Sequence, residues 1–408
     1  MYHKTVLDNG LKVITEEIPH FKSASIGIWV NAGSRDETEK NNGISHFIEH
    51  MIFKGTKTRT ATEIAELMDG VGGQLNAFTE KEHTCFYARV IDRHTDMAME
   101  LLFDMLNNSV FEPVELERER SVILDEIRLY DDSPDDIVFD MFNKLIWDSH
   151  PLGRPIAGTK EIIESITRED IFGYIKSRYL GGNIIISATG NIKHDEIVAM
   201  CNRYSKGLTA SPPELRKAET FVPYQKRSIS RKKDCEQTYV IIGKEGISAR
   251  DEAKYCLSIT DSILGSSMSS RIFQEIREKR GLAYSVGSFA HTLSDTGVFG
   301  IFAGTSPSTL DEVVNLSIEI TENMRKNGAL PEEISRAKEQ LKGSLSLALE
   351  STSGRMLRLA KSEFYHGRLI PPEEIFEKID KVTTEDISAL CEKLLNTSDY
   401  SKAVLGQI

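Results

Sequence analysis

The sequence contains an internal repeat, and a repeat restricts a chain to folds built from two similar halves. Residues 166–192 (ITREDIFGYIKSRYLGGNIIISATGNI) align without gaps onto residues 382–408 (VTTEDISALCEKLLNTSDYSKAVLGQI). Each copy runs from Thr-x-Glu-Asp-Ile through an amphipathic segment into an apolar run that ends Gly-x-Ile. The alternative is a chance likeness between two helix-to-strand segments. Because the shared residues keep one register, a duplicated chain with halves of about 200 residues is the simpler account.

Local patterns predict both strands and helices. Alternating apolar runs typical of strands lie at 23–30, 85–91, 238–243 and 298–303. Amphipathic segments at 113–130 and 331–349 predict helices, and the first residues read as two short strands joined by Asp8-Asn9-Gly10. Because strands and helices do not alternate strictly, we expect an α+β fold. Each half would be a sandwich of helices and a mixed, largely antiparallel sheet.

The repeat also predicts where the halves divide. The stretch from Gly207 to Lys217 contains Ser and Pro and has little periodicity, which is typical of an interdomain joint. We therefore expect an N-terminal domain over 1–207, a linker over 208–230 and a C-terminal domain over 231–408.

Composition excludes several classes of protein. The formal charge of −12 argues against a nucleic-acid partner, because phosphate binding relies on clustered Lys and Arg. No apolar run approaches the length of a membrane span, and the N-terminus lacks a signal-peptide pattern, so we expect a cytoplasmic protein. The five cysteines never form a CxxC pair, which favours reduced core residues over disulfides or a thiolate metal site.

The stretch from Asn42 to Gly55 contains the sequence HFIEH, with His46 and His50 four residues apart and Glu49 between them. A helix opened by Asn41 and Asn42 would place both imidazoles on one face, where they could bind one metal ion. This is the inverted order of the HExxH zinc motif. A histidine pair on an apolar helix is, however, more often structural, and the motif needs a third ligand.

A candidate for that ligand lies in the predicted helix at 113–130. Glu119 and Glu126 are seven residues apart and share a face, which Val122 and Ile123 mark as buried. Carboxylates that face a core are costly unless they are paired or bind a metal. The other interpretation, that both are exposed glutamates, remains open from this helix alone.

Together these motifs resemble the HxxEH zinc metallopeptidases, the family of pitrilysin, insulin-degrading enzyme and the mitochondrial processing peptidase. Three further stretches carry the resemblance, which spans nearly the whole chain. They are GGQLNAFT at 72–79, HPLGRPIAGT at 150–159 and SRIFQEIREKRGLAYSV at 270–286. The chain's length is similar to that of the short, bacterial-type members. The resemblance implies a LuxS/MPP-like metallohydrolase fold.

The resemblance also implies roles for individual residues. His46, His50 and Glu126 would bind one Zn²⁺ per chain, with Glu49 as the general base. Glu119 would hydrogen-bond a metal ligand and tune its basicity. Arg277 and Tyr284 would come from the second half to contact the substrate, and Asn76, Ala77 and Phe78 would form a substrate-binding edge strand.

The resulting hypothesis is a zinc-dependent endopeptidase that hydrolyses unfolded peptides or presequence-like segments within a closed chamber. An edge strand binds an extended peptide through its backbone, which a folded substrate cannot offer. By resemblance to the short members, we expect a homodimer. Two rival hypotheses are a non-catalytic, peptide-binding partner subunit of a processing-peptidase-like complex and a protein that holds zinc without turnover. The intact motif and Glu49 disfavour both.

The second half has only two histidines, His291 and His366, and no His/Glu pair at helical spacing. We therefore expect one active site per chain. His83 lies close to the proposed edge strand, and we interpret it as a surface polar residue.

Overall fold

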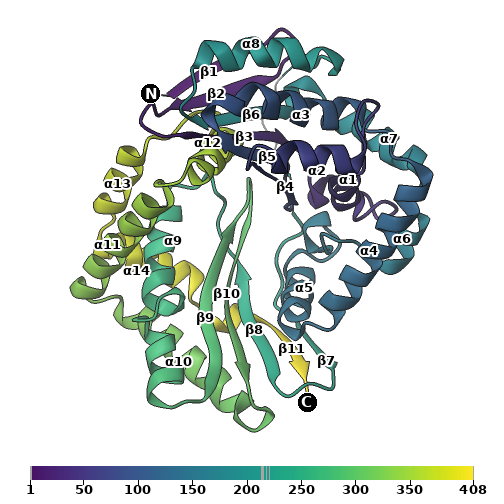
Figure 1. The fold of residues 1–408 in the computed structure, drawn as a ribbon. Helices are drawn as coiled ribbons and strands as arrows, with labels where there is room; N and C mark the ends of the chain where they lie inside the picture. The colour runs from purple at the N-terminus through teal and green to yellow at the C-terminus, as the bar shows by residue number, and fades with distance from the viewer. Residues whose placement is uncertain (1, 213–215, 217, 220, 408) are drawn as a thin grey trace. The chain divides into compact units, whose positions relative to one another are not determined.

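A computed structural model describes residues 2–212, 216, 218–219 and 221–407. Within the expected linker, residues 213–215, 217 and 220 lie outside the described residues. By packing, the chain divides into two compact units (Figure 1). The first unit comprises Met1–Arg128, Arg154–Arg216 and Leu347–Leu369, and the second comprises Leu129–Gly153, Lys217–Ser346 and Ile370–Ile408.

The first unit is built on a sheet that, in the described residues, has six strands in the order β1-β2-β6-β3-β5-β4. The bounds are β1 Tyr2–Val6, β2 Lys12–Glu17, β3 Ser23–Val30, β4 Gln74–Thr79, β5 Thr84–Ile91 and β6 Ile184–Gly190. All neighbours pair antiparallel except β2 and β6, which are parallel. The β4 strand forms one edge of this sheet, and its outer backbone groups are open to another chain.

Helices cover both faces of the first sheet (Figure 1). The first unit takes these helices from the first half of the chain: α1 Ile44–Ile52, α2 Ala61–Asp69, α3 Thr95–Asn108, α4 Pro113–Asp131, α6 Lys160–Ser165, α7 Arg168–Arg178 and α8 His194–Tyr204. Most of their apolar side chains join one large core with Ile26, Ile28 and Ile186. On the other face, Met356, Leu359 and Phe364 of α12 (Thr352–His366) pack against Trp29 and other buried residues.

The second unit repeats this plan with β7 Ser228–Lys232, β8 Thr238–Glu245, β9 Ala283–Thr292, β10 Gly297–Thr305 and β11 Ser401–Gly406. Their order among the described residues is β7-β11-β8-β10-β9, with one parallel pair, β7 and β11. The helices are α5 Pro134–Trp147, α9 Lys254–Asp261, α10 Leu310–Asn327, α11 Pro331–Ala348, α13 Pro372–Lys381 and α14 Thr384–Leu394. Here α5 packs on one face of the sheet, and α9, α10 and α14 pack on the other.

The two sheets confirm the duplication and the α+β fold. Strands β2-β6-β3-β5-β4 correspond in order and direction to β7-β11-β8-β10-β9. Helices α7 and α14 begin with the same capping box, Thr167 with Asp170 and Thr383 with Asp386, in which each side chain bonds the other residue's backbone N–H. The strands that follow end at a glycine with positive φ. The predicted strands and helices are all found, with bounds that differ by a residue or two.

The two packing units differ from the contiguous ranges 1–207 and 231–408, because each unit contains one segment that belongs to the other range. Helix α12 lies late in the chain but packs on the first sheet, and α5 lies early but packs on the second. Each sheet therefore receives one covering helix from the other half of the sequence. Among the described residues, no helix combines the length and apolar character that crossing a membrane requires.

Candidate metal centre

Helix α1 carries the HFIEH sequence, and a buried carboxylate fixes where it begins. The helix starts at Ile44, after Gly43 with φ +96°, and not at an asparagine cap as predicted. The Glu37 carboxylate accepts hydrogen bonds from the backbone N–H groups of Gly43 (2.7 Å) and Ser45 (2.9 Å) and from the Asn42 amide. Glu37 therefore takes the capping role, and burial raises the pKa of its carboxyl.

Helix α4 presents both predicted carboxylates on its inner face. Its buried residues are Leu116, Glu119 and Ile123, spaced as one face of a helix, and Glu126 continues the same stripe. Glu119 is 4% exposed, so the interpretation of two exposed glutamates is wrong for it. Val122 is 45% exposed and does not mark the buried face as predicted, because it lies at the edge of that stripe, about 100° around the helix from Ile123.

The three predicted metal ligands, His46, His50 and Glu126, lie close together. One ligand atom from each of His46, His50 and Glu126 lies within 4.8 Å of the others, and this is the one such group among the described residues. Glu126 Oε2 is 3.6 Å from His46 Nε2 and 3.5 Å from His50 Nε2. Ligand atoms in a tetrahedral zinc site lie about 3.3 Å apart, given zinc–ligand distances of about 2.0–2.1 Å. Two imidazoles and a carboxylate at this spacing fit a zinc ion.

The electrostatics of the group also suit a cation. Burial and the neighbouring His50 lower the pKa of His46 to about 4, so this imidazole is neutral at pH 7 and offers a lone pair. Burial acts to lower the pKa of His50, but its contacts with Glu126 and Glu119 outweigh burial and raise it. The contact with His50 lowers the pKa of Glu126. A metal must therefore compete with a proton at His50, and its binding releases protons.

Glu49 lies beside the three ligands and is held by a strand. The Thr79 hydroxyl, at the end of β4, donates a hydrogen bond of 2.6 Å to Glu49 Oε2. Burial raises the pKa of the Glu49 carboxyl, although the Thr79 bond acts against this shift. A carboxylate with a raised pKa is a better proton acceptor near neutral pH. The sequence alone did not predict the hydrogen bond between Thr79 and Glu49.

Glu119 contacts a ligand and, at its other oxygen, a lysine. Its Oε2 lies 3.2 Å from His50 Nδ1, and its Oε1 lies 2.7 Å from Lys54 Nζ. This arrangement fixes the Nδ1 side of His50 and leaves Nε2 facing Glu126. Lys54 was missed in the sequence, although residues 46, 50 and 54 follow one another at four-residue spacing.

Two family models match the chain. "Insulinase (Peptidase family M16)" matches residues 12–160, which include every residue of the metal group, and "Peptidase M16 inactive domain" matches residues 165–341. The chain belongs to peptidase family M16. The second description agrees with the described residues of the second unit, where no group of metal-binding residues is found.

Curated relatives of this M16 chain are named as zinc proteases. One from Bacillus subtilis, "Uncharacterized zinc protease YmxG", is 38% identical over 100% of this chain and 98% of its own length. A Rickettsia felis relative described as "Uncharacterized zinc protease" is 39% identical over 98% of this chain and 96% of its own length. With the family models, they establish a zinc-dependent metalloprotease.

Solved structures agree on the fold. A Pseudomonas fluorescens structure described as a peptidase M16 inactive domain superposes with a TM-score of 0.93 and 22% identity, covering 100% of this chain and 98% of that one. A protease from Helicobacter pylori gives a TM-score of 0.90 at 22% identity, covering 100% and 99%.

The remaining predicted residues of the M16 chain lie on β4 and in the second unit. Asn76, Ala77 and Phe78 are in the edge strand β4, as a substrate-binding role requires. Arg277 lies in a π-helical turn, Phe273–Lys279, and Tyr284 is the second residue of β9. The Arg277 guanidinium stacks 4.8 Å from the centre of the Tyr284 ring, and Tyr284 is 76% exposed. Their part in the reaction stays a prediction.

The interpretation of His83 as a surface residue is wrong. His83 is 1% exposed, and its ring stacks on Phe364 of α12 with the centroids 5.4 Å apart. Its Nε2 lies 3.1 Å from Glu80 Oε2, and Glu80 also pairs with Lys361 of α12. Helix α12 is far from His83 in the sequence, so nothing local to His83 signals this burial.

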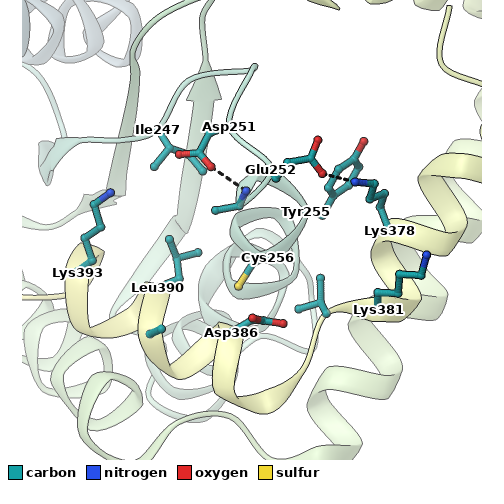
Figure 2. Close-up of a pocket in the computed structure, with 13 residues that line it drawn as sticks. Ile247, Asp251, Glu252, Tyr255, Cys256, Lys378, Lys381, Asp386, Leu390 and Lys393 are labelled. Atoms are coloured by element: carbon teal, nitrogen blue, oxygen red, sulfur yellow. Dashed lines mark hydrogen bonds and ion pairs between the residues drawn. The ribbon is translucent and has the colours of Figure 1, made fainter.

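A concavity of about 450 Å³ lies in the second unit. Figure 2 shows residues that line it, among them Cys256 of α9, Lys378 of α13 and Leu390 of α14. Several of its charged groups are engaged: Lys378 pairs with Glu252, and Asp251 accepts from the Ala253 N–H. Burial raises the pKa of the Cys256 thiol to about 11, so it is not a thiolate at neutral pH. Among the described residues that line it there is no histidine, and the concavity lacks a catalytic set.

Proposed function

We propose that this M16 zinc peptidase is an endopeptidase that hydrolyses unfolded peptides or presequence-like segments, with the peptide bound in extended form along β4. The observation that carries the proposal is the convergence of His46, His50 and Glu126, with Glu49 beside them. A structural zinc site has no use for a free carboxylate next to an open position.

Each residue of the site has its own role in the proposed reaction. His46, His50 and Glu126 would hold one Zn²⁺, which when bound lowers the pKa of water and polarises a carbonyl. Glu49 accepts a proton from the water that attacks the peptide carbonyl. It then donates this proton to the departing amine nitrogen, so the C–N bond breaks and the base is restored.

Substrate binding is assigned to β4 and to the Arg277–Tyr284 pair. The exposed edge of β4 supports the addition of an extended peptide strand, because its outer backbone groups have no partner strand among the described residues. We assign to the Tyr284 hydroxyl the donation of a hydrogen bond to the developing oxyanion, and to Arg277 a hold on the peptide backbone. Closure of a chamber around the peptide would allow β4, Arg277 and Tyr284 to contact the same substrate.

Three further expectations remain proposals: a homodimer, a cytoplasmic location and the lack of a nucleic-acid partner. The similarity of length to short family members supports the first. The acidic composition supports the last.

The test uses the full chain and a mixed library of unstructured peptides, with products identified by mass spectrometry. Wild type should cleave internal bonds, a chelator should stop cleavage, and added zinc should restore it. Glu49→Gln should retain a single zinc per chain but lose cleavage, because the amide accepts no proton. Glu66→Gln on the exposed face of α2 serves as the matched control. Cleavage by Glu49→Gln at the wild-type rate would refute the assignment of the base. Wild type that binds peptides without cutting them would favour the non-catalytic partner subunit.

A further inference from the structure

The Glu119 carboxylate lies between two partners, each on its own oxygen. His50 Nδ1 is 3.2 Å from Oε2, and Lys54 Nζ is 2.7 Å from Oε1. Only 5% of the Glu119 side chain is exposed, so water contributes little to its solvation. A carboxylate this buried needs a compensating charge and a fixed hydrogen-bond geometry. Lys54, with 30% of its side chain exposed, supplies the charge from the border of the site.

We propose that Lys54 is a positioning residue of the zinc centre. Its ammonium holds the Glu119 carboxylate so that Oε2 accepts a hydrogen bond from His50 Nδ1–H, which turns Nε2 of His50 toward Glu126. The inference rests on the proposed ligand set of His46, His50 and Glu126, and it adds a residue that acts through Glu119.

Two observations single out Lys54. Arg120 is next to Glu119 in sequence, but its guanidinium donates to the backbone carbonyls of Ile163 and Ile166 and pairs with Glu117. The second observation is an asymmetry between the two histidines. His46 Nδ1 is buried and has no hydrogen-bond partner among the described residues, whereas His50 has Glu119. The orientation of the metal ligands is therefore fixed through His50 and not through His46.

The consequence is a measurable effect on zinc affinity. Loss of a residue that orients a metal ligand weakens metal binding by about 10–100-fold. Lys54→Met keeps the length and apolar stem of the side chain but removes the charge, so we expect a loss in this range. Lys54→Arg keeps the charge and should bind zinc within about threefold of wild type.

A double-mutant cycle distinguishes positioning from a general structural effect. If Lys54 acts through Glu119, then Lys54→Met has little left to remove once Glu119→Gln is present. The double variant should bind zinc within about twofold of Glu119→Gln alone. Lys57→Met, an exposed lysine three residues further on, is the matched control and should bind as wild type.

The experiment measures the zinc dissociation constant of the full chain by competition with a fluorescent chelator, together with thermal unfolding of the metal-free proteins. Metal-free Lys54→Met should unfold within a few degrees of wild type. Wild-type zinc affinity in Lys54→Met would overturn the proposal, as would effects of Lys54→Met and Glu119→Gln that simply multiply. Unfolding of metal-free Lys54→Met and Lys54→Arg alike would also contradict it. Zinc binding needs no substrate, so a failure to cleave peptides would refute the proposed function and leave this inference standing.

Discussion

Replacement of Thr79 by valine should slow catalysis without weakening metal or peptide binding. The Thr79 hydroxyl donates a 2.6 Å hydrogen bond to Oε2 of Glu49, the proposed base. A hydrogen bond to a charged group contributes about 1.5–3 kcal/mol. If this bond holds Glu49 in its reactive position, its loss lowers kcat by about 10–100-fold.

Valine suits this test because it differs from threonine mainly in the hydroxyl. It keeps the β-branch that favours a strand, and the backbone pairing of Thr79 with Thr84 of β5 does not depend on the side chain. The backbone edge that β4 offers to a peptide is unchanged, so KM should stay within about threefold. Thr79→Ser retains the donor and is the matched control.

The assay is steady-state cleavage of one quenched fluorescent peptide, with the zinc content of each variant measured in parallel. The expected pattern is a low kcat, an unchanged KM and full zinc content for Thr79→Val, with Thr79→Ser close to wild type. A wild-type kcat in Thr79→Val would show that this hydrogen bond does not hold Glu49 in its reactive position. So would a variant in which only KM rises, because Thr79 would then serve peptide binding and not the base.

Two further predictions concern the turn after β4 and the second unit. Burial acts to raise the pKa of Glu80, but the contacts with His83 and Lys361 outweigh it and lower that pKa to about 2. The ionised Glu80 therefore stabilises the fold above its ordinary pKa of about 4.3, and this contribution is lost as pH falls toward 2. Because 43% of the Glu80 side chain is exposed, its ionised form contributes at most about 1 kcal/mol to the stability of the fold. The difference in Tm between wild type and Glu80→Gln should therefore be small at pH 6 and smaller at pH 3. A difference in Tm that grows on acidification would contradict this prediction. Tyr284→Phe should lower kcat by about 10–100-fold with KM little changed if its hydroxyl meets the oxyanion, and a change in KM alone would show that Tyr284, stacked on Arg277, serves binding instead.

Much of the fold could be predicted because the signals are local. The capping boxes at Thr167 and Thr383 stand in the sequence as the same pattern and fold into the same helix start. The four-residue spacing of His46 and His50 predicts a shared helix face, and the structure places their rings 4.7 Å apart. Glu126 is different, since it is 76 residues beyond His50. The helix pattern made it a candidate together with Glu119, and only the resemblance to a family chose it as the ligand.

Features that depend on distant segments could not be predicted. Glu37 caps α1 from outside the helix, and its role needs a loop whose path the sequence does not specify. The burial of His83 depends on Phe364, because α12 packs on a sheet from the other half of the sequence. The contact between Lys54 and Glu119 could be predicted only in part. The four-residue spacing of Lys54 from His50 stands in the sequence, but its partner Glu119 lies on another helix.

The central claim is that two imidazoles and the Glu126 carboxylate bind the same zinc ion. The most direct test is a crystal structure of the zinc-loaded protein, with the ion located by its anomalous scattering. We expect an ion about 2.0–2.2 Å from Nε2 of His46, Nε2 of His50 and a carboxylate oxygen of Glu126, with one position left for solvent. Zinc bound elsewhere, or bound by the histidines with Glu126 turned out of reach, would contradict it.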